Sequence, residues 1–465
     1  MSEADLQNQG DALGAGEDVF AVSTELVRAV EAAVAEARGD DLRGLVAELH
    51  AADLADLLTV LKRDDRRDLV GVLGDDLDPD VLIELEGQVL VDILETMAPR
   101  ALALAIPELE TDEAVYLLEN LEEDKRERVL TLVPAPDRAA MIEGLTFPED
   151  SAGRLMQRDF IAVPAYWTVG QVIDYCRETE DLPDEFYSIY VIDPRFRPIG
   201  HVPLNRVMRT KRPVLMREIL DEDGTPIPVE MDQEEVAYLF QQYRLASAPV
   251  TDSNGRLVGV ITFDDAAEVL EDEAEEDMMR LSGVASETDL LDPVLRTTRT
   301  RATWLLVNLA TAILASVVIA LFEGTIEQIV ALAVLMPIVA SMGGNAGTQT
   351  LTVAVRAMAT RDLTATNAMR IVGKEVTVGG INGVVFAVLM GLVAGFWFSS
   401  PGIGLVIAAA MVVNLLVAGL SGVLIPLGLQ RAGVDPAVAA SVFLTTVTDV
   451  IGFFAFLGLA AMFLL

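Results

Sequence analysis

One carboxylate stands inside a long apolar stretch near the C-terminus. Asp449 lies in FLTTVTDVIGFF, where Thr445, Thr446 and Thr448 add hydroxyl oxygens on the adjacent turn. A charge near the centre of a bilayer costs about 3 kcal/mol on insertion scales, so a carboxylate there indicates a functional site. A cluster of anionic and hydroxyl oxygens suits a hydrated divalent cation. The alternative is a helix-packing hydrogen bond to a neighbouring hydroxyl, which a neutral side chain would make as well.

A glycine-rich segment interrupts a second apolar stretch, in MPIVASMGGNAGTQT. Its polar and small residues are Gly343, Gly344, Asn345, Gly347 and Gln349. If the glycines break the helix, the exposed carbonyl and amide oxygens would line a water-filled cavity. If they do not, the run of small residues would let two helices pack closely. The segment alone favours neither alternative, and the carboxylate described above favours the cavity.

A third group of candidate ligands is the acidic segment DDAAEVLEDEAEEDMMRL, which we expect to be helical up to about Leu281. Glu268, Glu271 and Glu275 recur at helical spacing, so their carboxylates stack on one face. Like charges at this spacing destabilise a helix, and divalent cations that bridge them to another acidic surface would reverse that effect. The alternative is a solvated acidic face, since the chain has only 4 lysines and surplus acid could be an adaptation to high salt.

The elements that would position the first two groups are membrane spans, each of which takes about 20 apolar residues. Five stretches qualify, at roughly 302–322, 328–350, 376–398, 403–428 and 437–463. Basic residues precede the first stretch and lie in the connectors after the second and fourth, whereas the other two connectors have none. The positive-inside rule then predicts a multi-pass protein of the cell membrane, with a cytoplasmic N-terminal half and the C-terminus outside.

Charge divides the 465-residue chain at the first of these stretches. Residues 1–295 hold 66 acidic and 25 basic side chains, a net charge of −41, whereas residues 296–465 hold 6 and 8, a net of +2. The acidic half has the wrong sign for a nucleic-acid partner. A single cysteine, Cys176, and two histidines exclude a disulfide framework and the usual zinc sites, so any metal is a hard cation held by oxygen.

The acidic half divides into two regions. Short amphipathic helices separated by acidic turns are predicted at 52–62, 112–121 and 137–145, which indicates an all-α array of helical hairpins. Residues 155–270 hold an imperfect duplication of helix, strand, turn and strand, with SNG as a hairpin turn in the second copy. The duplication resembles a pair of CBS modules, an α/β sensory fold. Neither region contains a nucleophile motif or a phosphate-binding loop, so an enzyme is not expected.

The order of these parts resembles the MgtE family of magnesium channels and transporters. The motifs that carry the resemblance are FPEDSAGRLM at 147–156, DQEEVAYLFQQY at 232–243, the acidic segment within 257–284, MPIVASMGGNAGTQT and DPAVAASVFLTTVTDVIGFF. The resemblance implies a multidomain protein. Its domains would be a disordered acidic N-terminus (1–20), an all-α helical-hairpin N-domain (21–150), two α/β CBS modules (151–214 and 215–270), an amphipathic linking or plug helix (271–298) and an all-α pore domain of five spans (299–465).

The same resemblance implies a homodimer that passes Mg²⁺ through a pore and closes when cytosolic Mg²⁺ binds the plug helix. Asp449 matches the selectivity carboxylate, and Asp435 matches a carboxylate at the inner mouth. The implied ion pathway is Asp449, Asn345, Gly343, Gly344, Gly347, Gln349, Thr445 and Asp435. The implied regulatory Mg²⁺ ligands are Asp112, Asp232, Glu234, Asp265, Glu268, Glu273, Glu276 and Asp277. Arg244 departs from the pattern, because the family often has an acidic residue there, so one regulatory site is altered or missing.

ATP is a further candidate ligand of the CBS pair. Thr262 and Asp265 fit a Gly-x-x-Thr-x-x-Asp pattern that contacts ribose and phosphate, whereas Pro203 and Arg206 stand at the equivalent places of the first copy. At most one nucleotide site is therefore expected. The alternative function is a transporter of another divalent cation, such as Mn²⁺ or Co²⁺, whose CBS modules sense nucleotides.

Overall fold

The computed structural model describes residues 22–179, 182–183, 186–222, 224, 226–284, 293–364 and 366–465. The chain forms two compact units, residues 1–270 and 271–465, and each is described here by itself. The predicted N-terminal segment 1–20 lies outside the described residues, as does the part of the predicted linking segment at 285–292.

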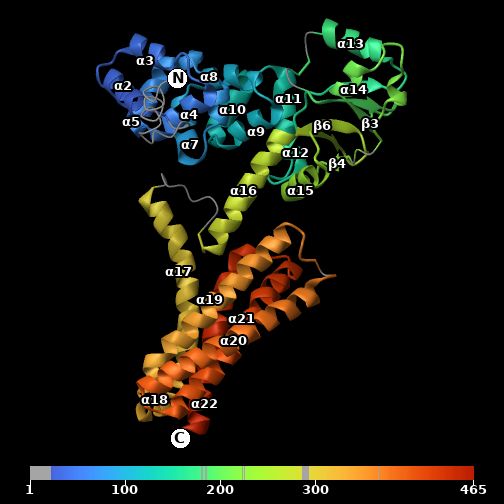
Figure 1. Cartoon of the computed structure of the whole chain (residues 1–465). Coiled ribbons are helices and arrows are strands. Elements are labelled where there is room, and N and C mark those ends of the chain that lie inside the picture. The colour runs from blue at the N-terminus through green and yellow to red at the C-terminus, as the bar shows by residue number, and fades with distance from the viewer. Residues whose placement is uncertain are drawn as a thin grey trace, which may run out of the picture. The chain divides into compact units, whose positions relative to one another are not determined.

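The first unit begins with an array of short helices (Figure 1). They are α2 (Thr24–Ala35), α3 (Gly39–Val46), α4 (Ala51–Val60), α5 (Arg63–Leu73), α6 (Asp80–Ile83), α7 (Gly87–Thr96), α8 (Pro99–Ala105), α9 (Thr111–Glu119), α10 (Glu123–Leu132), α11 (Ala135–Gly144) and α12 (Ala152–Leu155), with 3₁₀ turns at Gly74–Asp76 and Ile106–Glu108. Helices α2 to α11 contribute apolar residues at helical spacing to one core, in which Leu58, Leu82, Leu90 and Leu118 are fully buried. The predicted helices at 52–62, 112–121 and 137–145 are confirmed as α4, α9 and α11.

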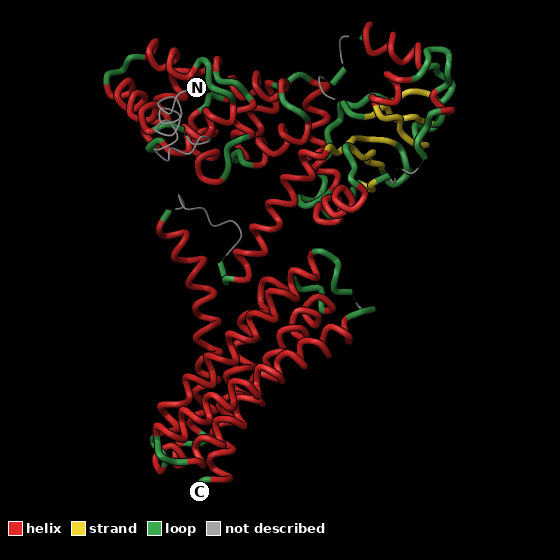
Figure 2. The backbone as a smooth tube through the Cα atoms, in the orientation of Figure 1, coloured by secondary structure: helices red, strands yellow, loops and turns green. Residues whose placement is uncertain are grey.

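Two three-stranded sheets follow, separated in sequence but built alike (Figure 2). Their elements are β1 (Ala162–Pro164), α13 (Val169–Glu178), β2 (Ser188–Ile192), β3 (Pro198–Pro203), α14 (Leu204–Arg209), a 3₁₀ turn at Met216–Glu218, β4 (Ile227–Pro228), α15 (Gln233–Tyr243), β5 (Ser247–Thr251) and β6 (Leu257–Thr262). In each copy the first strand pairs parallel with the second, and the second pairs antiparallel with the third. The predicted duplication is therefore confirmed as a repeat of strand topology.

Residues near the predicted boundary of each copy pack into the core of the other copy. Ala152 and Met156 precede β1, yet they are buried in the core that contains β5 and α15. Met216 follows the first sheet by sequence, and it is buried in the core of that first sheet. The two copies thus share chain at their junctions, and the boundaries 151–214 and 215–270 stay a prediction.

The second unit is helical and contains the membrane spans. Its first residues belong to α16 (Phe263–Leu281), the predicted acidic helix, which begins in the first unit. The remaining helices are α17 (Val294–Ala320), α18 (Glu323–Gln328), α19 (Ala331–Ala359), α20 (Ala368–Trp397), α21 (Pro401–Arg431) and α22 (Pro436–Phe463). Among the described residues, five helices are long and apolar enough to cross a membrane, as predicted: α17, α19, α20, α21 and α22. α20 begins eight residues before the predicted span, so Lys374 and Glu375 lie in its first turns rather than in a loop.

The glycine-rich segment does not break its helix, so the prediction of irregular backbone there is wrong. α19 continues without interruption from Ala331 to Ala359. The physical reason is close packing, the other alternative for this segment. A methyl group at Gly343 would lie 2.1 Å from the side chain of Asn414 on α21, and one at Gly347 would lie 2.9 Å from Leu444 on α22. The glycines therefore let α19 approach both neighbouring helices.

Candidate ion pathway and regulatory site

Asp449 lies at the midpoint of α22, in one of the five candidate spans. Its carboxylate is half-buried and has no hydrogen-bond or ion-pair partner among the residues that the structure describes. The hydroxyl of Thr446 donates to the carbonyl of Val442 at 2.6 Å, and that of Thr448 donates to the carbonyl of Leu444 at 3.1 Å. The neighbouring hydroxyls thus donate to backbone carbonyls of α22 and not to Asp449. The alternative that Asp449 makes a helix-packing hydrogen bond is therefore not supported among the described residues.

α19 packs against α22 and presents a polar face that the protomer leaves open. The exposed residues of this face recur at helical spacing: Ser341, Asn345, Thr348, Gln349 and Thr352. The amide of Asn345 donates to the hydroxyl of Ser341 at 3.3 Å. On α22, exposed Thr445 lies one turn before Asp449. Polar side chains on a membrane helix require water or a polar partner, so these two faces are suited to line an aqueous path.

The predicted ion-pathway residues therefore divide into two groups. Asn345, Gln349 and Thr445 are exposed on the polar faces, whereas Gly343 and Gly347 are buried at helix contacts. Gly344 is half-buried, and a side chain added there would meet nothing within 4 Å. The glycines thus position the polar face, and the carbonyl ligands that a broken helix would offer do not arise.

Asp435, the last predicted pathway residue, begins α22 and accepts a hydrogen bond from the backbone nitrogen of Ala437 at 2.8 Å. It also forms an ion pair with Arg280 of α16, which in turn pairs with Glu276. Burial, with repulsion from Asp435 and Glu273, raises the pKa of the Asp277 carboxyl to about 6. Sequence reasoning missed Arg280, although it is the one basic residue in the acidic segment.

A second acidic group lies in the first unit, where α9 and α16 begin. Asp112 has a buried carboxylate oxygen, Oδ1, without a hydrogen-bond partner in the described chain. Burial raises the pKa of Asp112 well above its usual value, and the charges of Asp265 and Glu110 raise it further. Burial and repulsion from Glu113 and Asp265 raise the pKa of Glu110 to about 7. Asp112 and Asp265 were both predicted as regulatory ligands, and the structure brings them together although they are 153 positions apart in the sequence. It adds Glu110 and Glu113 to this group, which the sequence analysis did not identify.

The remaining predicted regulatory residues have different surroundings. Asp232 is exposed and caps α15 by accepting a hydrogen bond from the backbone nitrogen of Glu234 at 3.0 Å. Glu268 is exposed on α16, and Glu273 is half-buried. Within the described ranges, no three His, Cys, Asp or Glu side chains gather in a group that could hold a metal ion. Mg²⁺ usually keeps several waters and binds through one or two carboxylates, so paired carboxylates fit its coordination.

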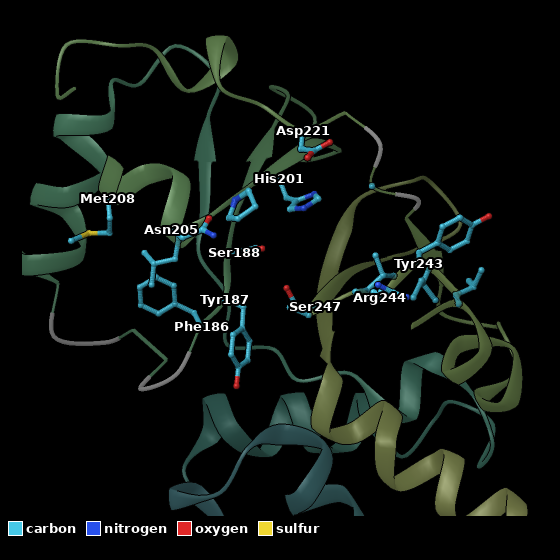
Figure 3. Close-up of a pocket in the computed structure, with 17 residues that line it drawn as sticks. Phe186, Tyr187, Ser188, His201, Asn205, Met208, Asp221, Tyr243, Arg244 and Ser247 are labelled. Atoms are coloured by element: carbon cyan, nitrogen blue, oxygen red, sulfur yellow. The ribbon is translucent and has the colours of Figure 1, made fainter. Parts of the chain in front are cut away.

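A cavity of about 820 Å³ lies between the two sheet-containing copies. Side chains of the first copy, such as His201 and Asn205, line one side, and Tyr243, Arg244 and Ser247 of the second copy line the other (Figure 3). Arg244, the residue that departs from the expected pattern, ends α15 in the left-handed conformation at φ 54°. The cavity is large enough for a nucleotide-sized ligand.

The predicted nucleotide residues do not line this cavity. Thr262 donates to Asp265 Oδ2 from its backbone nitrogen at 3.0 Å and from its hydroxyl at 2.7 Å. This pair stabilises the start of α16 in the manner of a capping box. Pro203 of the first copy does line the cavity, and Arg206 pairs with Asp221, which also lines it. The cavity therefore adjoins the copy whose sequence departs from the nucleotide pattern.

Because of the acidic group around Asp112, we expect the free energy of unfolding of the protein to fall as pH rises. Its carboxyls have raised pKa values, so the folded chain retains protons that the unfolded chain releases near pH 4. Without divalent cations, the midpoint of thermal unfolding should therefore fall between about pH 5 and pH 7.5. Mg²⁺ at about 100 times its dissociation constant should restore roughly 5–10 °C at the higher pH and less at the lower. Scanning calorimetry of the full-length protein in detergent measures both effects. An Asp112→Asn variant should flatten the pH dependence, and an unchanged slope in that variant would contradict the assignment.

Comparison with known proteins agrees with this architecture. Three family models match: the divalent cation transporter model MgtE over residues 336–459, the MgtE intracellular N domain over residues 49–150, and the CBS domain over residues 216–272. The magnesium transporter MgtE of Thermus thermophilus is 34% identical over 336 residues, which cover 71% of this chain and 74% of that protein. This chain belongs to the MgtE family. It is accordingly a multi-pass membrane protein of a transporter family and not an enzyme.

Further comparisons also match MgtE proteins. The magnesium transporter MgtE of Enterococcus faecalis is 32% identical over 322 residues, which cover 69% of this chain and 71% of that protein. A crystal structure of the cytosolic domain of the Mg²⁺ channel MgtE in complex with ATP is 29% identical and has a TM-score of 0.49, covering 52% of this chain and 99% of that domain.

Proposed function

We propose that this MgtE-family protein carries Mg²⁺ into the cell through its membrane unit. The observation that carries the proposal is Asp449, an unpartnered carboxylate among the described residues at the midpoint of α22, a helix that packs against α19 with its open polar face. Carboxylate, hydroxyl and amide oxygens on two packed helices suit a cation that keeps part of its water shell. Relatives at 32% and 34% identity are named magnesium transporters, which supports Mg²⁺ as the cation.

The working unit in this proposal is a homodimer. The polar faces of α19 and α22 are open in one protomer, and a second copy would enclose them between two membrane units. The basic connectors support a cytoplasmic soluble half and a C-terminus on the outside, by the positive-inside rule. Mg²⁺ would then enter down its electrochemical gradient, past Asp449 and out at Asp435.

Closure of the pathway by cytosolic Mg²⁺ is the second part of the proposal. Asp112, Asp265, Glu273, Glu276 and Asp277 are the regulatory ligands, with Glu110 beside the first two. Mutual repulsion of these carboxylates favours separation of the acidic surfaces, and bound Mg²⁺ removes the repulsion. Moving an open-to-closed ratio from 99:1 to 1:99 takes about 5.5 kcal/mol, which four sites that each favour closure by about 1.4 kcal/mol would supply.

A nucleotide is the second candidate ligand of the soluble half. The 820 Å³ cavity offers the rings of Tyr187 and Tyr243 for stacking and the guanidinium of Arg244 for a phosphate. Burial lowers the pKa of His201, so its imidazole is neutral at pH 7 and adds a hydrogen-bonding group without charge. These residues support ATP in the cavity, with Thr262 and Asp265 left to the start of α16.

The deciding experiment measures Mg²⁺ flux into proteoliposomes that hold the purified protein, while Mg²⁺ varies on the face that exposes the soluble half. We expect flux at low Mg²⁺ on that face and suppression at high Mg²⁺. Parallel measurements use Mn²⁺ and Co²⁺ as the transported ion, and a repeat titration includes ATP. Flux that ignores Mg²⁺ on that face but responds to ATP, or that prefers Mn²⁺ or Co²⁺, would favour the nucleotide-sensing alternative. Absence of Mg²⁺ flux would contradict the proposed function.

A further inference from the structure

Asn414 is a fully buried amide in the apolar core of the membrane unit. It lies on α21 in AMVVNLLVAG, without another polar side chain within five residues on either side. Its Nδ2 donates to the carbonyl of Val339 on α19 at 2.8 Å. Its Oδ1 is buried and has no hydrogen-bond partner in the described part of the chain. This amide therefore reaches from α21 to the helix that carries the open polar face.

The same amide lies between two glycines on different helices. A methyl group at Gly343 of α19 would lie 2.1 Å from Asn414 Nδ2, and one at Gly452 of α22 would lie 2.8 Å from the same nitrogen. Both distances are too short for a side chain, so the amide contacts the two backbones directly. Gly343 is two residues before Asn345, and Gly452 is three residues after Asp449. One side chain thus touches both segments that form the candidate ion pathway.

Stability alone does not explain an amide at this position. The unpaired Oδ1 lowers the stability of the folded unit, and an apolar side chain of similar shape would remove that loss. Leu332, Met411 and Phe456 surround the same core without polar atoms of this kind. What the amide adds is a directed hydrogen bond to one carbonyl of α19, which fixes the depth and rotation of that helix against α21.

We propose that Asn414 is a positioning residue of the ion pathway. It holds the start of the glycine-rich segment of α19 against α22, and so sets how the side chains of Asn345 and Asp449 meet the ion. The inference rests on the proposed function, because it assigns the ion affinity to that placement. Groups that orient metal ligands without touching the metal typically contribute 10–100-fold to metal affinity or activity.

The test compares Asn414→Leu with the wild type in proteoliposomes. We expect the half-saturating Mg²⁺ concentration for flux to rise by about 10-fold or more, with an unchanged or higher midpoint of thermal unfolding. Ser421→Ala is the matched control, since Ser421 is another buried polar residue on α21, two turns away. The control should keep the half-saturating concentration of the wild type. An unchanged half-saturating concentration in folded Asn414→Leu would overturn the proposal.

A pair of variants separates positioning from space filling. Gly452→Ala places a methyl group against the amide, so we expect loss of flux. Adding Asn414→Ala to it makes room for that methyl group, and should restore the thermal midpoint without restoring the half-saturating concentration. If the double variant recovers both, the role of Asn414 is packing alone, and the proposal is wrong.

A distance measurement keeps this test independent of the proposed function. Absence of Mg²⁺ flux in the wild type would contradict the proposed function by itself. Cysteines introduced at the exposed positions Val334 on α19 and Phe454 on α22 carry spin labels, in a Cys176→Ser background that removes the native thiol. The distance between the two labels then reports the placement of the two helices. Asn414→Leu should broaden or shift the measured distance. An unchanged distance distribution would overturn the positioning role.

Discussion

Asp449→Asn is expected to abolish Mg²⁺ flux while leaving the membrane unit folded. The substitution keeps the size of the side chain and removes its charge, so the packing of α22 is preserved. Because Asp449 has no hydrogen-bond or ion-pair partner among the described residues, no ion pair is broken by the change. Loss of a directly contacting carboxylate should cost more than the 10–100-fold typical of residues that only orient metal ligands. We therefore expect flux to fall by at least about 100-fold.

The measurement is Mg²⁺ uptake into proteoliposomes, with thermal unfolding of the same preparations as the test of folding. Glu327→Gln is the matched control. Glu327 is an exposed carboxylate on α18, and its substitution removes one negative charge from the same unit. The control should transport at the rate of the wild type. If Asp449→Asn transports at a comparable rate, Asp449 is not the ion site, and the pathway must be sought elsewhere. Asp449→Glu, which retains the charge on a longer side chain, should keep part of the flux.

The order of domains could be predicted because it rests on long-range patterns in the sequence. Five apolar stretches, short amphipathic helices and a duplicated strand pattern each survive an error of several residues at their ends, so the architecture was predicted correctly. The backbone at residues 343–347 was not. Glycine lowers helix propensity by about 1 kcal/mol relative to alanine, which favours a break on local grounds. Here the packing of Gly343 on Asn414 and of Gly347 on Leu444 outweighs that preference.

The candidate sites show the same limit. Asp449 is visible in the sequence because a charge in an apolar stretch is costly wherever the helix packs. The proximity of Asp112 to Asp265, and of Asp435 to Arg280, depends on tertiary contacts that the sequence alone does not reveal. Asn414 is a lone amide in an apolar span, which is a weaker form of the pattern that identified Asp449. A single neutral polar residue in an apolar span is thus a signal of the same kind as a single charged one.

The regulatory proposal makes its largest prediction at the end of α16. A triple variant, Glu273→Gln, Glu276→Gln and Asp277→Asn, should keep conducting at Mg²⁺ concentrations that close the wild type. The wild-type carboxylates are held close together, since repulsion from Asp435 and Glu273 contributes to the raised pKa of Asp277. Mg²⁺ would relieve that repulsion, and the attraction that binds Mg²⁺ there comes from the negative charge of these side chains. Without those three charges, Mg²⁺ no longer favours the closed state through the end of α16, and the sites left around Asp112 supply too little preference to close the pathway.

The ion pairs of Arg280 offer a second explanation of closure, which the triple variant distinguishes from closure by Mg²⁺. Arg280 pairs with both Asp435 and Glu276, so its guanidinium joins α16 to the start of α22. If this ion pair alone held the pathway closed, the triple variant would close as the wild type does, because Arg280 and Asp435 are retained. If Mg²⁺ is required, flux in the triple variant should stay within about 2-fold of its low-Mg²⁺ value across the titration, since each lost site removes about 1.4 kcal/mol of preference for closure.

The matched control removes three carboxylates from a different exposed surface. Glu123→Gln, Asp124→Asn and Glu127→Gln on α10 change the net charge by the same amount, and all three side chains are exposed. This control should close at the Mg²⁺ concentration of the wild type, because it keeps the three carboxylates at the end of α16. It changes only exposed charges on another surface, whose long-range effect is screened by salt. Equal loss of closure in both triple variants would mean that the total acidity of the soluble half, and not a site at the end of α16, senses Mg²⁺. Closure lost only in the α16 variant assigns the sensor to Glu273, Glu276 and Asp277.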